Sequence, residues 1–122
     1  MTEFKFLNES KTLIVKINEE IDHHSCDLIK NKIDLTINFR NTQKLIFDFS
    51  GVNFMDSSGI GMVMGRYKSM NKNGGKTAVV GLKPTVRKIF NMSGLFKILE
   101  EYENVENAVN SVDTVLHSPT SL

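Results

Sequence analysis

The segment from Lys44 to Phe49 is apolar at positions that would point to both faces of a sheet. A strand with two buried faces lies inside a sheet that is covered on both sides, so this segment predicts a central strand. Asp48 is its one acidic residue, and we interpret it as a structural acid that accepts hydrogen bonds from loop N–H groups. Other strands and helices must therefore surround this segment.

A short loop with two serines joins this strand to an amphipathic run, Ile60 to Met70. The loop ends in Asp56-Ser57-Ser58-Gly59, and Asp and Ser are favoured where a helix begins, because their oxygens accept hydrogen bonds from its first N–H groups. Local chemistry alone therefore explains Asp56 and Ser57 as helix caps. The same position also suits a phosphate, because a helix N-terminus carries partial positive charge and free donors. Both interpretations stay open at this point.

Two alternating segments near the N-terminus, Glu3 to Leu7 and Thr12 to Ile17, predict a β-hairpin. Asp22 then stands where the N-cap of a helix from His23 to Phe39 is expected. Apolar residues recur three or four positions apart in that helix, which is the spacing of one buried stripe. This stripe consists of Cys26, Ile29, Ile33 and Ile37.

The helix after the loop is expected to bury a stripe formed by Ile60, Val63, Met64, Tyr67 and Met70. Gly61 and Gly65 lie one turn apart on another part of its surface. Glycine inside a helix costs up to ~1 kcal/mol, so we expect the sheet or a binding partner to approach these positions closely. Asn73-Gly74-Gly75 is expected to end the helix, because glycine adopts positive φ without strain.

Strands and helices continue to alternate in the C-terminal half. Thr77 to Val80 predicts a short buried strand, and Pro84 begins a helix that closes at Ser93-Gly94. Leu95 to Leu99 is expected to form the last strand. A final helix, capped by Asn104, has an apolar stripe at Val105, Ala108, Val109, Val112 and Leu116. The tail 117–122 is expected to fray.

This alternation predicts an α/β fold whose sheet contains parallel pairs joined by crossover helices. The 122 residues suffice for one domain, which we expect to span 1–116. The 15 basic and 14 acidic residues nearly balance and form no basic patch, so no nucleic acid partner is expected. With one cysteine, no apolar N-terminal segment and no run of membrane-spanning length, we predict a cytoplasmic protein that does not bind membranes.

Motifs of enzymes and ligand-binding proteins fit this chain poorly. A dinucleotide-binding loop needs G-x-G-x-x-G, and the third of glycines 59, 61 and 65 comes one position late for it. Gly75-Lys76-Thr77 is similar to the end of a phosphate-binding loop, but it leads from a helix into a strand, whereas that loop leads from a strand into a helix. Ser57 has Met55 where a serine hydrolase needs glycine, and the only later histidine lies in the tail. His23 and His24 diverge by about 100° on a helix and cannot easily share a metal. We expect no enzyme activity, cofactor or metal site.

Three segments resemble a known family: Phe54-Met55-Asp56-Ser57-Ser58-Gly59-Ile60-Gly61, Gly65-Arg66-Tyr67-Lys68 and Ile89-Phe90-Asn91-Met92-Ser93-Gly94-Leu95-Phe96-Lys97-Ile98. They are similar to the STAS-domain family of anti-anti-sigma factors, and the likeness covers roughly Phe4 to Val112. The Asp-Ser-Ser-Gly motif fits any such factor, whereas Met-Ser-Gly-Leu-Phe-Lys resembles the members that act in sporulation. This resemblance implies a STAS fold, with a mixed sheet of four to five strands and about four helices mostly on one face.

The resemblance also implies a mechanism. The unphosphorylated protein binds an anti-sigma factor that is also a serine kinase, and this releases a sporulation sigma factor. The kinase phosphorylates the serine directly after the aspartate, here Ser57 with Ser58 as the second choice, and a serine phosphatase binds transiently to reverse the reaction. The implied partner contacts are Glu20, Asp22, Asp56, Ser57, Ser58, Gly59 and Gly61. The free protein is expected to be a monomer, and a STAS regulator of another sigma factor, such as one in a general-stress pathway, is the alternative.

Overall fold

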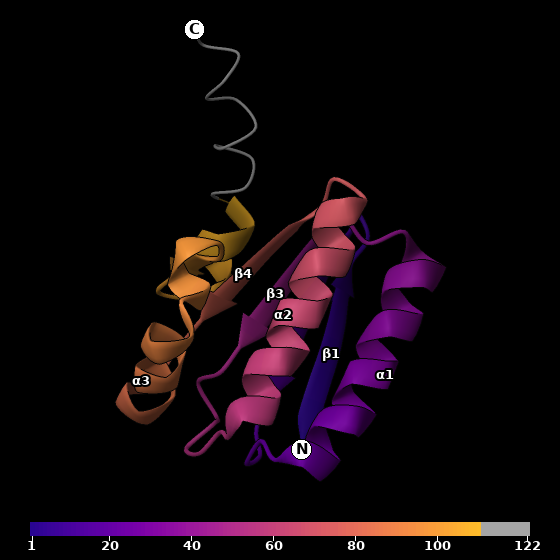
Figure 1. Ribbon diagram of the computed structural model, residues 1–122. Coiled ribbons are helices and arrows are strands. Elements are labelled where there is room, and N and C mark those ends of the chain that lie inside the picture. The colour runs from indigo at the N-terminus through magenta and orange to yellow at the C-terminus, as the bar shows by residue number, and fades with distance from the viewer. Residues whose placement is uncertain (111–122) are drawn as a thin grey trace, which may run out of the picture.

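In the computed structural model, which describes residues 1–110, five strands form one sheet in the order β1-β2-β3-β4-β5 (Figure 1). The strands are β1 (Thr2–Leu7), β2 (Thr12–Ile17), β3 (Lys44–Asp48), β4 (Lys76–Val80) and β5 (Glu100–Tyr102). β1 runs antiparallel to β2, and every later pair in this order is parallel. The central position of β3 in a mixed α/β sheet is therefore confirmed. The predictions for Val112, Leu116 and the tail 117–122 lie outside the described residues.

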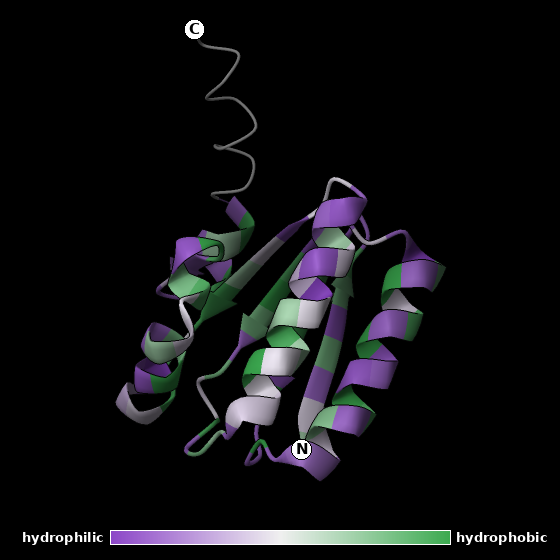
Figure 2. Cartoon of the chain, viewed as in Figure 1, coloured by the Kyte–Doolittle hydropathy of each residue, from purple (hydrophilic) through white to green (hydrophobic). Residues whose placement is uncertain are grey.

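Helices cover both faces of this sheet unequally. α1 (His23–Arg40), α2 (Ser57–Lys72) and α3 (Pro84–Ser93) lie on one face, where α1 and α2 run side by side in Figure 1. Figure 2 shows hydrophobic stretches in the strands behind them, whereas β1 alternates between hydrophilic and hydrophobic residues. The helix that begins at 105–110 packs on the opposite face, through a small core of Ile14, Ile46, Ala78, Val80 and Ala108. Most of the described helices thus share one face, as predicted.

α1 begins where the sequence predicted and ends one residue later. Asp22 is the N-cap, and it forms a capping box with Ser25 in which each side chain accepts a hydrogen bond from the other's backbone N–H. Asn41 ends the helix in the left-handed region, at φ 51°. The predicted stripe of Cys26, Ile29, Ile33 and Ile37 is buried against the sheet, so this prediction is confirmed.

The buried face of α2 is wider than the predicted stripe. Val63 and Met70 are buried as expected, but Ile60, Met64 and Tyr67 are only partly buried. Met62, which the sequence did not single out, is buried on the side that faces α1. The reason is that α2 packs against α1 on one side and α3 on the other, so its apolar residues spread around more of the helix than one stripe.

Gly61 and Gly65 of α2 do not allow the sheet to approach. A Cβ built on either glycine would have no heavy atom within 4 Å, so nothing in the described residues packs against these positions. The predicted approach to the sheet is therefore wrong, and the approach of a partner stays a prediction. α2 itself ends at Lys72, directly before Asn73-Gly74-Gly75, as the sequence indicated.

The segment from Leu95 to Leu99 is not a strand. Gly94 ends α3 with φ 78°, and Leu95–Lys97 then forms a turn of 3₁₀-helix. Leu95 and Leu99, four residues apart, are both buried, which a short helical turn achieves. The last strand, β5, begins only at Glu100, beside Ala78 of β4. The prediction failed because the apolar run reports burial and does not distinguish a tight turn from a strand.

The final helix begins at its predicted cap. The backbone N–H of Asn107 donates to Asn104 Oδ1 over 2.8 Å. Ala108 is buried, while Val105 and Val109 are partly buried, so the first part of the predicted stripe is confirmed. Within residues 1–110, no helix has the length and apolar character to cross a lipid bilayer.

Replacing Leu95, which is 0% exposed, tests how the segment after α3 packs on the core. We expect Leu95→Ala to lower the free energy of unfolding by about 2–4 kcal/mol, because it removes buried methyl groups and leaves a cavity. Ile98→Ala is the matched control, since Ile98 is 41% exposed and its truncation should cost less than about 1 kcal/mol. Urea unfolding followed by circular dichroism measures both. Equal losses at the two positions would contradict the burial of Leu95 in the core.

Candidate functional site

A short backbone contact ties together the segments that lead into α1 and α2. Ile21 and Met55 form an isolated parallel bridge. The N–H of Ile21 donates to the carbonyl of Phe54 over 3.0 Å, and the N–H of Asp56 donates to the carbonyl of Ile21 over 3.1 Å. The N-caps Asp22 and Asp56 follow the bridge directly, so both helices begin side by side two residues after it. Ile21 was not predicted to belong to this site, although Ile21-Asp22 and Met55-Asp56 repeat an apolar residue followed by a helix cap.

Both cap residues accept a hydrogen bond from the first turn of their helix, Asp22 within a capping box and Asp56 without one. Asp56 Oδ1 accepts from the N–H of Ser58 over 2.8 Å, and Asp22 Oδ1 accepts from the N–H of Ser25 over 2.9 Å. The hydrogen bond from the Ser25 backbone is the main cause that lowers the pKa of Asp22 below its ordinary value. The capping interpretation is thus confirmed for Asp22 and Asp56. It is wrong for Ser57, which is the first residue of α2 and whose side chain caps no N–H among the described residues. Capping by the two aspartates does not compete with a binding role, because Asp22 is exposed and Asp56 is half-buried.

Gly59 allows the first turn of α2 to lie against the bridge. A Cβ built on Gly59 would lie 2.3 Å from Met55 Sδ and 3.2 Å from Ile21 Cγ2. Met55 and Ile21 are themselves buried, so there is little free space to take up a displaced side chain. Gly59 is buried, and its local role is to admit this packing.

The two serines of the loop lie on different sides of the start of α2. Ser57 is exposed and borders an apolar groove with Ile60, Ile89, Met92 and Ser93, on the side of α3. Ser58 is half-buried and borders a groove of about 290 Å³ on the side of α1, together with His23 and Gly61. The Ser57 hydroxyl makes no hydrogen bond within the described residues. Ser57 is therefore the more accessible of the two hydroxyls.

Contacts from β3 and α3 hold the loop that carries the serines. Asp48 Oδ1 accepts from the N–H of Ser50 over 2.9 Å, which confirms it as a structural acid. Lys83 Nζ donates to Asn53 Oδ1 over 2.7 Å, and Thr85 Oγ1 donates to the carbonyl of Asn53 over 3.0 Å. The loop is thus attached to the sheet at its start and to α3 in its middle.

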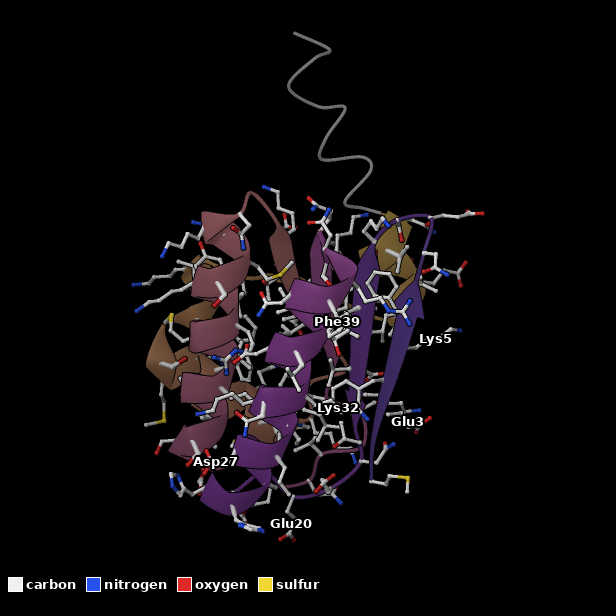
Figure 3. All side chains as sticks on the ribbon, turned by 90° about the vertical axis from the view of Figure 1, so that its right-hand side faces the viewer. Glu3, Lys5, Glu20, Asp27, Lys32 and Phe39 are labelled. Carbon is white, nitrogen blue, oxygen red and sulfur yellow. The ribbon has the colours of Figure 1, made fainter. Side chains whose placement is uncertain are left out.

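Most of the predicted contact residues gather at this end of the molecule. Asp22 and Glu20 stand at the start of α1, and Figure 3 labels Glu20 at that end. Glu20 is exposed and its carbonyl accepts from Ser25 Oγ over 3.2 Å. Asp56, Ser57, Ser58 and Gly61 stand at the start of α2. Gly59 is the exception, because it lies inside the packing and not on the surface.

The side chains around the serines do not form a reactive centre. His23 borders the groove of Ser58, but no hydrogen bond joins it to either serine within the described residues. Burial raises the pKa of the Cys26 thiol to about 11, so this thiol stays protonated and unreactive at neutral pH. Among residues 1–110, no three His, Cys, Asp or Glu side chains are grouped to hold a metal ion. Ser57 is the exposed hydroxyl of this surface.

Known proteins resemble this chain along most of its length. A model of the STAS domain matches residues 5–108. The anti-sigma F factor antagonist of Paenibacillus polymyxa is 40% identical over 103 residues, which cover 84% of this chain and 88% of that protein. The anti-sigma-B factor antagonist of Listeria monocytogenes is 29% identical over 91 residues, which cover 75% of this chain and 78% of that protein.

Solved structures share the fold. The anti-sigma factor antagonist SpoIIAA in its unphosphorylated form superposes with a TM-score of 0.83 at 31% identity, over 93% of this chain and 97% of that one. SpoIIAA of Bacillus in its phosphorylated form superposes with a TM-score of 0.74 at 30% identity, over 92% of this chain and 99% of that one. These superpositions confirm the fold predicted from the sequence.

Substitution of Asp56 tests the cap at the start of α2. We expect Asp56→Ala to lower the free energy of unfolding by about 1 kcal/mol, because the N–H of Ser58 loses its acceptor. Asp56→Asn keeps an acceptor oxygen at the same place and should cost less. Urea unfolding of the three proteins gives the comparison. If Asp56→Ala is as stable as the unsubstituted protein, the cap contributes nothing to the fold.

Proposed function

Since this chain belongs to the STAS-domain family, we propose that it is an anti-sigma factor antagonist whose binding surface is the paired starts of α1 and α2. The observation that carries this proposal is an exposed serine, Ser57, in the first turn of a helix beside Asp56. Two proteins that resemble this chain, one in sequence and one in structure, are antagonists of anti-sigma factors by name. The homologues are regulators, which agrees with the expectation that this chain is not an enzyme.

Phosphorylation of Ser57 is the proposed switch. The exposed hydroxyl, which has no partner among residues 1–110, can enter the active site of a kinase without disturbing the fold. That SpoIIAA has a phosphorylated form supports this part of the proposal. Ser58 is a poorer candidate, because it is half-buried in the groove beside α1.

A phosphate on Ser57 acts on the complex and leaves the free fold intact. It brings a charge of roughly −1.5 to −2. In the free protein, water and the helix dipole stabilise this charge. In a complex the partner covers the same place, so loss of water and repulsion by Asp56 fall on the bound state. A penalty of about 3–4 kcal/mol weakens binding by two to three orders of magnitude, which is enough for a switch.

The proposed partner is an anti-sigma factor that is itself a serine kinase, and a serine phosphatase resets the switch. The 40% identity with an anti-sigma F factor antagonist supports a sigma factor of sporulation, compared with 29% for the anti-sigma-B factor antagonist of Listeria monocytogenes. Co-purification from the native cell tests this choice, with and without ATP. Capture of a kinase that controls a general-stress sigma factor would select the alternative.

Ser57→Ala tests the acceptor. We expect this variant to fold, to remain unphosphorylated with the kinase and Mg-ATP, and to hold the anti-sigma factor permanently, because only the hydroxyl is lost. Ser58→Ala is the matched control and should still accept one phosphate. Mass spectrometry maps the site, and amide NMR shifts of the phosphorylated protein should change only around 56–61. Phosphate on Ser58 alone contradicts the assignment, and widespread shift changes contradict the local mechanism.

Asp22→Lys tests the acidic side of the surface. Asp22 and Glu20 are exposed at the start of α1, so we expect them to attract a basic patch on the anti-sigma factor. Charge reversal should slow association and weaken binding most at low salt, because exposed charges mainly tune the on-rate. Glu9→Lys, in the hairpin loop, makes the same change of charge away from the helix starts. If both variants show the same affinity and salt dependence, Asp22 does not belong to the interface.

A further inference from the structure

A second surface lies along the free edge of the sheet. β1 is an outer strand that pairs only with β2 among the described residues, so half of its backbone N–H and C=O groups face outward. Figure 3 looks onto this side, where Glu3 and Lys5 of β1 are labelled. Both side chains are exposed and point to the face of the sheet opposite α1, because Phe4 between them packs against the main core.

α1 carries an exposed apolar stripe next to this edge. Leu28, Leu35 and Phe39 are 66%, 64% and 87% exposed, and their spacing of seven and four residues puts them on one side of the helix. That side leans toward β1, since Leu28 and Phe4 line one groove. Large apolar side chains that gather on one side of a surface helix indicate a contact surface.

Two cation–π contacts show which residues of α1 lie beside which residues of β1. Lys32 Nζ lies 4.6 Å from the centre of the Phe4 ring, and the Arg40 guanidinium lies 5.1 Å from the centre of the Phe6 ring. α1 therefore runs in the same direction as β1, with Lys32 beside Phe4. Leu28 and Leu35 lie four residues before and three residues after this level.

We propose that β1 and the apolar stripe of α1 form the interface of a homodimer, in which the β1 strands of two copies pair antiparallel about Phe4. In this register Glu3 of one copy lies opposite Lys5 of the other, and the same pair repeats by symmetry. Opposite charges at facing positions stabilise antiparallel strands. The edge is thus complementary in charge to a second copy of itself.

The same two-fold axis also brings the apolar stripes of the two α1 helices together. Because the axis passes near Phe4, the two α1 helices run antiparallel with their Lys32 regions closest together. Leu28 of one copy then comes level with Leu35 of the other, since both lie almost equally far from the axis. The pairing is closed, because each copy uses its single β1 edge, so it produces a dimer and not a fibre. This interface replaces the free monomer expected from the sequence with a monomer–dimer equilibrium.

Charge reversal at the two β1 positions tests the register. Lys5→Glu puts two carboxylates opposite each other at both ends, and Glu3→Lys does the same with two ammonium groups. We expect each variant alone to weaken the dimer at least about tenfold. An equimolar mixture of the two variants should restore it, because each facing pair of the mixed dimer then joins a carboxylate of one chain to an ammonium group of the other. Sedimentation velocity over about a hundredfold range of concentration measures the association.

Controls separate the interface from general effects of charge and hydrophobicity. Lys68→Glu, an exposed change on α2, should leave the dimer as strong as in the unsubstituted protein. Leu35→Ser should weaken it about tenfold, whereas Met92→Ser, at an 80% exposed residue of α3, should not. A monomer at every concentration overturns the proposal. The proposal is also overturned if both single charge variants still form dimers, or if mixing the two variants does not restore the dimer.

Discussion

The parallel bridge between Ile21 and Met55 is the contact on which the functional end of the molecule depends. Its two backbone hydrogen bonds join segments that are separated in the chain by all of α1 and β3. The bridge is parallel, like the pairing of β2 with β3, and lies beyond the ends of both strands in a different register. Because each bridge residue is followed directly by a helix cap, Asp22 and Asp56 are fixed side by side before any side-chain contact is made.

Close packing at the bridge also decides which serine is accessible. Gly59 lets the first turn of α2 settle on Met55, and this contact fixes the rotation of the helix about its axis. With that rotation Ser57 faces solvent beside α3, and Ser58 faces the groove beside α1. Ser57 and Ser58 look equivalent in the sequence. They differ in exposure because Gly59, which follows them, must face the packed bridge.

Local patterns predicted what local chemistry controls. The capping of both helices followed from Asp22 and Asp56, and the central place of β3 followed from its apolar sequence. The bridge could not be predicted in this way, because neither Ile21 nor Met55 reports which distant segment it pairs with. The same limit explains the 3₁₀ turn at Leu95 and the buried Met62, since an apolar residue records that it is covered and not which element covers it.

The cap of α2 also reduces the number of free N–H groups that could bind a phosphate at the start of this helix. A free helix N-terminus offers several unpaired N–H groups to an anion. Here the N–H of Ser58 already donates to Asp56 Oδ1, and the N–H of Gly59 donates to the Asp56 carbonyl. The proposed phosphate on Ser57 would therefore find few donors within the described residues and would stay hydrated at the surface. A docking partner would have to remove the water around this phosphate, and that desolvation costs free energy. The cap that stabilises α2 would therefore also raise the free-energy cost of binding the phosphorylated protein.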